Sequence, residues 1–533
     1  MGHLTFKISY SNYFVVLSLH KIRPMKKNIL LSLLFLAFGG LQLSNAQKKT
    51  MAQHPAHHDS LVPDKNDSVP PPVVTHHHIT IDGKTINYTA TTGYMPLKDQ
   101  DGTMKAKIFY IAYVADNEDA DKRPVTYTFN GGPGSSSIWL HMGAIGPVRV
   151  HFADEKGDSP SPPYTYSDNE NSWLGFTDLV FIDPVSTGYS RTVKGVEASK
   201  YHGYSVDISS VGDFIRLYTT RNGRWGSPKF LTGESYGTTR ASGLSGYLQD
   251  AYGMYLNGIT LVSSVLNFEY IDMTRGNDLP YALFLPTYAT TAQYHKKLPS
   301  ELESISVSEL AKKTEIFASG TYTYFLMKGD QASADLTNKV IDSLNYFTGI
   351  PKNYIKSCNE RINDSRFFKE LLRDDGKTIG RYDSRYMGED ADDDGEIPSY
   401  DPSYSAVYGL FNGALNEYMH KDLNYKSDLP YEALTNVWPW PSTDNSYLDV
   451  SETLRRAMTQ NPALKVMVCC GYYDLATPFY NAEYAVGHMG LRNDVRNNII
   501  LNYYNAGHMM YANSEDDAKL KTDAEKFYQS AVK

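Results

Sequence analysis

The stretch KFLTGESYGTTRASGLSGYL, residues 229–248, changes character in its middle. The opening KFL suits the end of a buried strand, and after Thr238 small and apolar residues recur as they do along one side of a helix. Between the two lies GESYG, residues 233–237, in which glycines flank an acid and a serine. A sharp strand-to-helix turn exposes such a hydroxyl, and the helix that follows points N–H groups toward it. The stretch therefore predicts a nucleophile, Ser235, at the turn.

A serine nucleophile needs a base to take its proton and an acid to orient that base. The stretch VMVCCGYYDLATP puts Asp474 just after a strand-like run, and ILNYYNAGHMM puts His508 just after the next one. Serine, acid and histidine follow in the chain order of α/β hydrolases. We predict a triad of Ser235, Asp474 and His508.

Strand-like and helical runs alternate along much of the chain. Helical spacing joins Ile208, Val211, Ile215 and Tyr218, and the strand-like runs are KIFYIAYVA, VTYTF, LVFID, ITLVSSVL, LKVMVCCG and NNIILNYYNAG. This alternation predicts an α/β fold, with a mostly parallel central sheet and helices on both faces. Between residues 269 and 451 it gives way to helical pieces and tyrosine-rich irregular sequence. We expect an inserted, largely helical cap over one end of the sheet.

The N-terminal region has the features of an export signal. Met25 and two lysines precede the apolar run NILLSLLFLAFGGLQL, and the small residues SNA follow it. The expected divisions are an upstream extension and secretory signal (1–46), a linker or disordered leader (47–78), the first part of the core (79–268), the cap (269–451) and the second part of the core (452–533). The mature protein is then periplasmic or secreted, without a membrane association. The alternative is a retained N-terminal anchor.

Net charge and cysteine content limit the partners and the disulfides that the protein can have. The net charge of −9, without a basic stripe, argues against a nucleic-acid partner. Only three cysteines are present, so at most one unstrained disulfide can form, from Cys358 to Cys469 or Cys470. We predict no cofactor, and oligomeric state is left open.

A further glycine-rich stretch points to a family. FNGGPGSSS, residues 129–137, follows a strand and leaves backbone N–H groups uncovered, as a loop that completes an oxyanion hole does. Together with SWLGFTDLVFIDPVSTGYS, TGESYG, GYYDLATP and AGHM, it resembles the serine carboxypeptidase family from about residue 107 to the C-terminus. The resemblance implies a serine-type carboxypeptidase that removes C-terminal residues from peptides through an acyl-enzyme.

The resemblance also implies roles for residues around the serine. Asn130, the N–H of Gly131 and Glu234 would bind the free carboxylate of the substrate. The N–H groups of Gly132 and Tyr236 would form the oxyanion hole. Two carboxylates at hydrogen-bond distance cannot both stay ionised, so Glu234 would have to be protonated when substrate binds.

Three positions depart from the family pattern. Ser135 stands where a cysteine is common, and Thr128 stands where better-known secreted members have tryptophan. A glutamate that supports the carboxylate-binding acid falls on Ala144, with Trp139 and His141 as nearby substitutes. These departures leave the triad intact and put carboxylate recognition in question.

An acidic segment, DADDDGEIPSYD at residues 390–401, has part of the spacing of a calcium loop. Pro398 occupies a ligand position and Asp401 replaces the usual final glutamate, so a solvated acidic loop is the preferred interpretation. We predict no metal site.

Two other functions remain compatible with the motifs. An ester hydrolase or acyltransferase would use the same triad, and a peptide-binding module would carry it without turnover. Recognition of a C-terminal carboxylate by Glu234 and Asn130 separates the peptidase from the esterase.

Overall fold

The computed structural model describes residues 69–154, 157–443 and 446–532. The chain divides into a unit of residues 1–63 and a second unit of residues 64–533, and all described residues belong to the second. The predicted signal and most of the predicted leader lie outside the described residues.

One large sheet forms the centre of the second unit. Within the described residues it has ten strands, in the order β1-β2-β3-β7-β4-β9-β10-β13-β14, with β8 paired to β3. Its strands are β1 (Val73–Ile81), β2 (Lys84–Lys98), β3 (Met104–Ala115), β4 (Val125–Phe129), β7 (Asp178–Ile182), β8 (Arg191–Thr192), β9 (Lys229–Ser235), β10 (Gly258–Ser264), β13 (Lys465–Gly471) and β14 (Ile499–Tyr504). The first three strands pair antiparallel, and the six from β7 to β14 pair parallel. Two small hairpins accompany it, β5 (Val148–Val150) with β6 (Tyr166–Asp168) and β11 (Lys377–Ile379) with β12 (Met387–Glu389).

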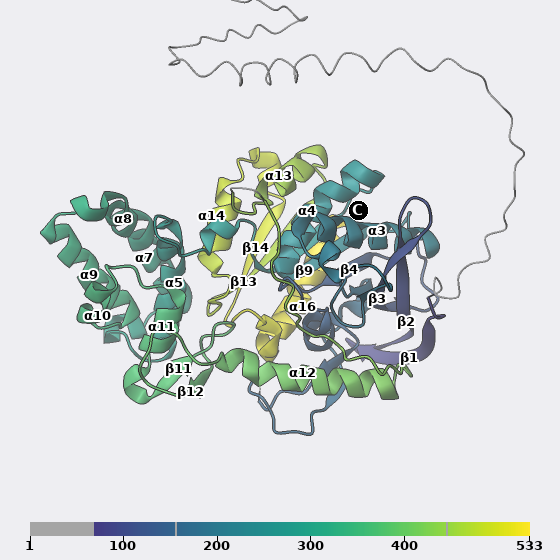
Figure 1. The fold of residues 1–533 in the computed structure, drawn as a ribbon, viewed down its shortest axis with the longest axis horizontal. Helices are drawn as coiled ribbons and strands as arrows, with labels where there is room; N and C mark the ends of the chain where they lie inside the picture. The colour runs from purple at the N-terminus through teal and green to yellow at the C-terminus, as the bar shows by residue number, and fades with distance from the viewer. Residues whose placement is uncertain (1–68, 155–156, 444–445, 533) are drawn as a thin grey trace, which may run out of the picture. The chain divides into compact units, whose positions relative to one another are not determined.

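Helices cover both faces of this sheet (Figure 1). They are α2 (Ile138–Leu140), α3 (Tyr204–Arg221), α4 (Tyr236–Tyr252), α5 (Leu279–Tyr294), α6 (Ser300–Glu303), α7 (Val307–Phe317), α8 (Thr323–Lys328), α9 (Ala334–Thr348), α10 (Lys352–Ser357), α11 (Asp364–Glu370), α12 (Pro402–Lys421), α13 (Ser451–Gln460), α14 (Phe479–His488), α15 (Asn493–Arg496) and α16 (Ser514–Ala531). The predicted α/β class is confirmed.

Alternate side chains of the buried strands enter two separate apolar cores, as the period of two along a strand requires. In β13, Val466 and Val468 join the core beneath α3, α4, α13 and α14. Met467 and Cys469 join the core beneath α2, α12 and α16. Burial on both faces explains why these strands are continuous apolar runs in the sequence.

The segment between β10 and α13 divides into two parts. Helices α5 to α11 enclose an apolar core of their own and lie beside α14 (Figure 1). Helix α12 leaves this group and packs against α2 and the short π-helical turn η2 (His141–Ile145), so its apolar face belongs to a core of the main sheet. The insertion is largely helical, as predicted, but only its first part forms a separate body.

Three further observations concern the predictions. The first strand begins at Val73, six residues before the expected start of order near Ile79, because every residue of VVTHHHITI pairs with β2 although several are polar. Cys358, Cys469 and Cys470 are buried and free. Among the described residues, no helix combines the length and apolarity needed to cross a membrane.

Candidate active site

The serine turn is tighter than the sequence indicated. Strand β9 continues to Ser235, and α4 starts at the next residue, so one residue with φ 59° and ψ −129° makes the reversal. A Cβ at Gly233 would lie 2.1 Å from the carbonyl oxygen of Gly237. Glycine is therefore required at position 233 by close backbone approach.

Asp474 and His508 meet beyond the carboxyl ends of β13 and β14. The Nδ1 of His508 and the Oδ2 of Asp474 are 2.8 Å apart, and both residues are buried. The other carboxylate oxygen accepts hydrogen bonds from the backbone N–H groups of Ala476 (2.8 Å) and Thr477 (2.9 Å). The acid is thus held in a fixed orientation, which in turn fixes the imidazole.

Burial opposes a charge on His508, but the neighbouring Asp474 carboxylate outweighs it, and the pKa of His508 is raised above its ordinary value. This is the electrostatic arrangement of a base whose protonated form is stabilised by an acid.

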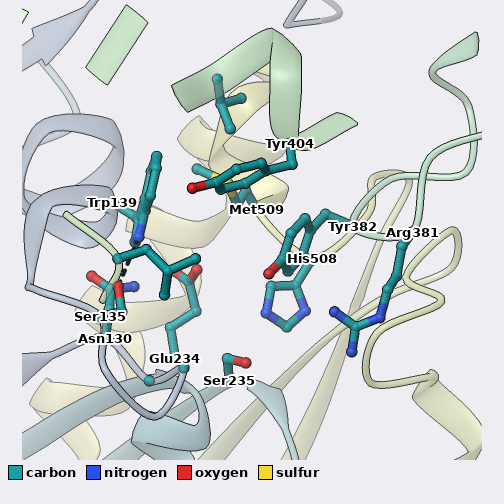
Figure 2. Close-up of a pocket in the computed structure, with 14 residues that line it drawn as sticks. Asn130, Ser135, Trp139, Glu234, Ser235, Arg381, Tyr382, Tyr404, His508 and Met509 are labelled. Carbon is teal, nitrogen blue, oxygen red and sulfur yellow. Dashed lines mark hydrogen bonds between the residues drawn. The ribbon is translucent and has the colours of Figure 1, made fainter. Parts of the chain in front are cut away.

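Ser235 and His508 line one pocket (Figure 2). The hydrogen bonds of the described residues do not include one between the Ser235 hydroxyl and His508. Catalytic hydrogen bonds often become short only when a substrate is in place. The structure therefore brings the three predicted triad residues together, without a hydrogen bond between Ser235 and His508 among the described residues.

The predicted oxyanion loop follows β4 and lies against the start of α4. A Cβ at Gly131 would come within 2.3 Å of the backbone nitrogen of Tyr236, so only glycine allows this approach. Gly132 lines the pocket with Ser235. Both predicted oxyanion donors thus belong to segments that meet beside the serine.

Asn130 is fixed at its backbone and at its side-chain oxygen. Its carbonyl accepts from Arg240 (2.6 Å), whose guanidinium is itself paired with buried Asp207 at 2.8 Å. Its Oδ1 accepts from the N–H of Leu140 at 3.1 Å. The amide nitrogen of Asn130 is buried without a hydrogen-bond partner, and Asn130 lines the pocket. Such a donor is costly unless a ligand satisfies it.

Glu234 is 3% exposed and lines the pocket beside Ser235. Burial raises the pKa of Glu234 to about 7, against the opposing effects of His508 and of the hydrogen bond from Tyr511. The Tyr511 hydroxyl donates to Oε2 of Glu234 at 2.8 Å. A carboxyl group with this pKa is largely protonated in mildly acidic solution and can donate a hydrogen bond.

Tyr511 is a partner of Glu234 that sequence reasoning missed. Ala144 is buried in η2, and the preceding Gly143 lies against the Tyr511 ring, where a Cβ would come within 2.5 Å of Cε2. The only signal in the sequence is that Tyr511 follows His508 by three residues.

The two substitutes suggested for that glutamate do other things. His141 bonds the hydroxyl of Tyr113 at 2.7 Å and is not among the residues that line the pocket, so that suggestion was wrong. Trp139 lines the pocket, but its Nε1 donates to Ser135 at 2.9 Å. Thr128 is buried within β4 and is not among the pocket residues.

A loop of the insertion, between β11 and β12, supports the loops that carry Asp474 and His508. The N–H of Leu475 donates to the carbonyl of Arg381 at 3.1 Å, and the N–H of His508 to the carbonyl of Tyr382 at 2.6 Å. The N–H of Gly507 donates to Oδ2 of Asp383 at 3.0 Å. No sequence pattern indicated these contacts.

The acidic segment at residues 390–401 is occupied by structural roles. Asp390 pairs with buried Lys369 at 2.6 Å, and Asp401 accepts from the N–H groups of Ser403 and Tyr404 at the start of α12. No group of three or more histidine, cysteine, aspartate or glutamate side chains in the described residues is arranged to hold a metal ion.

Comparison with known proteins decides the family. Residues 81–511 match the serine carboxypeptidase family. The chain belongs to this family. Its central sheet with helices on both faces is the α/β-hydrolase fold that the sequence predicted.

Individual relatives are distant. The serine carboxypeptidase-like 8 protein of Arabidopsis thaliana is 24% identical over 200 residues, which are 36% of this chain and 43% of the relative. The pheromone-processing carboxypeptidase KEX1 of Yarrowia lipolytica is 24% identical over 226 residues, 40% of this chain and 32% of the relative. These matches thus span less than half of either relative. A crystal structure of the prohormone-processing carboxypeptidase KEX1(Δ)p from Saccharomyces cerevisiae has a TM-score of 0.49 and 15% identity, covering 83% of this chain and 91% of that one.

Proposed function

We propose that this serine carboxypeptidase family member releases single residues from the C-termini of peptides, with Ser235, His508 and Asp474 as its catalytic triad. The observation that carries the proposal is that two groups line the pocket of the serine together: a buried, weakly acidic Glu234 and an Asn130 amide without a hydrogen-bond partner among the described residues. An ester or acyl-transfer site has no need of either group, whereas a free carboxylate matches both.

Recognition of the substrate's end uses three donors in this proposal. Protonated Glu234 donates one hydrogen bond to the peptide carboxylate, the Asn130 amide a second and the Gly131 N–H a third. Tyr511 occupies Oε2 of Glu234, which leaves Oε1 to carry the proton toward the substrate. An ionised Glu234 would instead repel the peptide carboxylate.

The reaction then proceeds in two halves. His508 takes the proton of the Ser235 hydroxyl as Oγ attacks the scissile carbonyl carbon, and the carbonyl oxygen becomes an oxyanion facing the N–H groups of Gly132 and Tyr236. The C–N bond breaks, and His508 gives its proton to the leaving amino acid. Water, deprotonated by His508, attacks the acyl-enzyme ester, and Ser235 recovers its proton as the shortened peptide leaves.

A direct test compares three forms of one N-blocked dipeptide: the free acid, the C-terminal amide and the methyl ester. The proposal expects release of the free amino acid from the peptide acid, with a KM well below that of the amide in mildly acidic solution. If the ester alone is turned over, the ester-hydrolase alternative replaces the peptidase. If none is turned over while the dipeptide acid still binds, the peptide-binding alternative holds.

We also propose that residues 269–451 act as a cap on the hydrolase core, which the separate apolar core of α5 to α11 supports.

We further propose that the chain is exported, which the signal-like residues 25–46 support. N-terminal sequencing of the mature protein from its host should give a start near Gln47. A soluble mature protein that begins at Met1 or Met25 would refute export.

A further inference from the structure

Arg381 brings a positive charge to the catalytic pocket from outside the hydrolase core. It lines the pocket together with Ser235 and His508 and comes from the loop between β11 and β12. Its backbone is held on both sides: the N–H donates to Oδ1 of Asp401 at 3.1 Å, and the carbonyl accepts from the N–H of Leu475 at 3.1 Å. The position of Arg381 is therefore fixed relative to the loop that carries the catalytic acid.

Within the part of the chain that the structure describes, the Arg381 guanidinium has no acidic partner. No ion pair of the described residues includes Arg381, and Arg381 is exposed where it lines the pocket. It lies over the ring of Tyr382, with 5.4 Å from the guanidinium carbon to the ring centre, and that ring packs against His508. Arg381 is also the only lysine or arginine among the described residues that line this pocket. A charge in such a place is available to a ligand.

The side of the pocket on which Arg381 lies indicates which part of a peptide it would meet. In Figure 2, Asn130 and Glu234 lie on one side of Ser235 and His508, and Arg381 lies on the other. With the terminal carboxylate at Asn130 and Glu234 and the scissile carbonyl at Ser235, the remaining peptide runs toward Arg381. The first side chain met there belongs to the penultimate residue.

We propose that Arg381 selects peptides with an acidic penultimate residue. The proposal rests on the proposed carboxypeptidase function and extends it to a substrate class. The guanidinium would pair with an aspartate or glutamate side chain on the acyl side of the scissile bond, while the terminal carboxylate is bound separately by Glu234 and Asn130. Because the peptide covers the pocket, it also shields this pair from water.

The test uses two N-blocked dipeptides that share one C-terminal residue and have glutamate or glutamine before it. These side chains are nearly equal in size and differ in charge, so the ratio of their kcat/KM values reports the charge preference. We expect wild type to favour glutamate by about 3- to 5-fold, the size of a partly exposed ion pair. Arg381→Gln should bring the ratio to about 1, and Arg381→Lys should keep most of it.

Charge reversal gives a second measure that loss of structure cannot produce. Arg381→Glu should favour a lysine dipeptide over the glutamine dipeptide, whereas wild type disfavours lysine. Lys377→Gln is the matched control, since it removes an equal exposed charge from β11 outside the pocket and should leave every ratio unchanged.

Several outcomes overturn the inference while leaving the proposed function in place. One is hydrolysis of both dipeptides by wild type at equal kcat/KM. Others are an unchanged ratio in Arg381→Gln, or a charge preference that follows the C-terminal residue instead. Absence of hydrolysis of any dipeptide acid would instead contradict the carboxypeptidase function itself.

Discussion

At the residue scale, the proposed binding of a peptide carboxylate depends on the protonation of Glu234. Burial raises its pKa to about 7, and the hydrogen bond from Tyr511 opposes the rise because it favours the carboxylate. The two effects together set the pH above which the proposed site binds a peptide carboxylate more weakly.

Replacing Tyr511 should therefore shift this pH. In Tyr511→Phe the carboxylate loses a hydrogen-bond donor, so the pKa of Glu234 rises further. The pH at which KM for peptide acids begins to rise should then increase by roughly one unit. The measurement is KM against pH for one dipeptide acid. Tyr504→Phe is the control, since Tyr504 is equally buried and bonds Asp523, outside the pocket. A downward shift, or the same shift in both variants, would contradict the assigned role.

The proposed nucleophile is tested by deletion of one oxygen. Ser235→Ala should lower kcat by about 10⁴- to 10⁶-fold with unfolding unchanged, and His508→Ala should do nearly the same. The double variant should be little worse than either single one, because the residues act as a unit. Retention of a tenth of wild-type activity by Ser235→Ala would mean that another residue is the nucleophile.

At the element scale, the loop between β11 and β12 supports the loops that carry Asp474 and His508. Asp383 accepts from the N–H of Gly507 and pairs with Arg385 at 2.6 Å, while Arg385 donates to the carbonyl of Asn505 at 2.7 Å. These contacts tie the insertion to the loop that carries His508.

Weakening this support should slow chemistry more than binding. Asp383→Asn should lower kcat by roughly 10- to 100-fold through misplacement of His508, with little change in KM, since Glu234 and Asn130 are untouched. Asp494→Asn serves as the control, because it breaks an exposed ion pair that is not part of the loop between β11 and β12. An equal loss in both variants, or a rise in KM alone, would show that Asp383 does not position the histidine.

The same elements show what could be predicted from sequence. Strands such as β4 and β9 and the turn at Ser235 were predictable because their patterns are local: apolar runs, glycine spacing and the order of three triad residues. Tyr511, Arg381 and Asp383 were not, because each acts through contacts between segments far apart in the chain. The start of β1 at Val73 was missed because one face of that edge strand is polar.

At the scale of the whole molecule, a buried histidine joins the insertion to the core. His141 of η2 contacts Phe181 of β7, and Tyr113 of β3 bonds both His141 and Tyr418 of α12. Burial lowers the pKa of His141 to about 3, so the folded protein keeps this ring neutral while the unfolded chain protonates it near its ordinary value.

The sign of the resulting pH effect is fixed. A base whose pKa is lower in the folded state contributes stability that is present above its unfolded pKa and is lost as pH falls below it, by up to about 1.4 kcal/mol per pH unit. His141→Phe should therefore lose less unfolding free energy than wild type between about pH 6.5 and pH 4. Chemical denaturation at both pH values measures it, and exposed His151→Gln is the control. An equal loss in wild type and His141→Phe would contradict this prediction.

In the proposed function, a protonated Glu234 binds the C-terminal carboxylate of a peptide. The most direct measurement is KM from about pH 5 to pH 8 for a dipeptide acid and its amide, in wild type and Glu234→Gln. We predict that KM for the acid rises in wild type as Glu234 ionises near its pKa of about 7, while KM for the amide stays nearly constant. Glutamine keeps a donor that cannot ionise, so the variant should show a flat profile for the acid. Parallel profiles for acid and amide in wild type would contradict the claim.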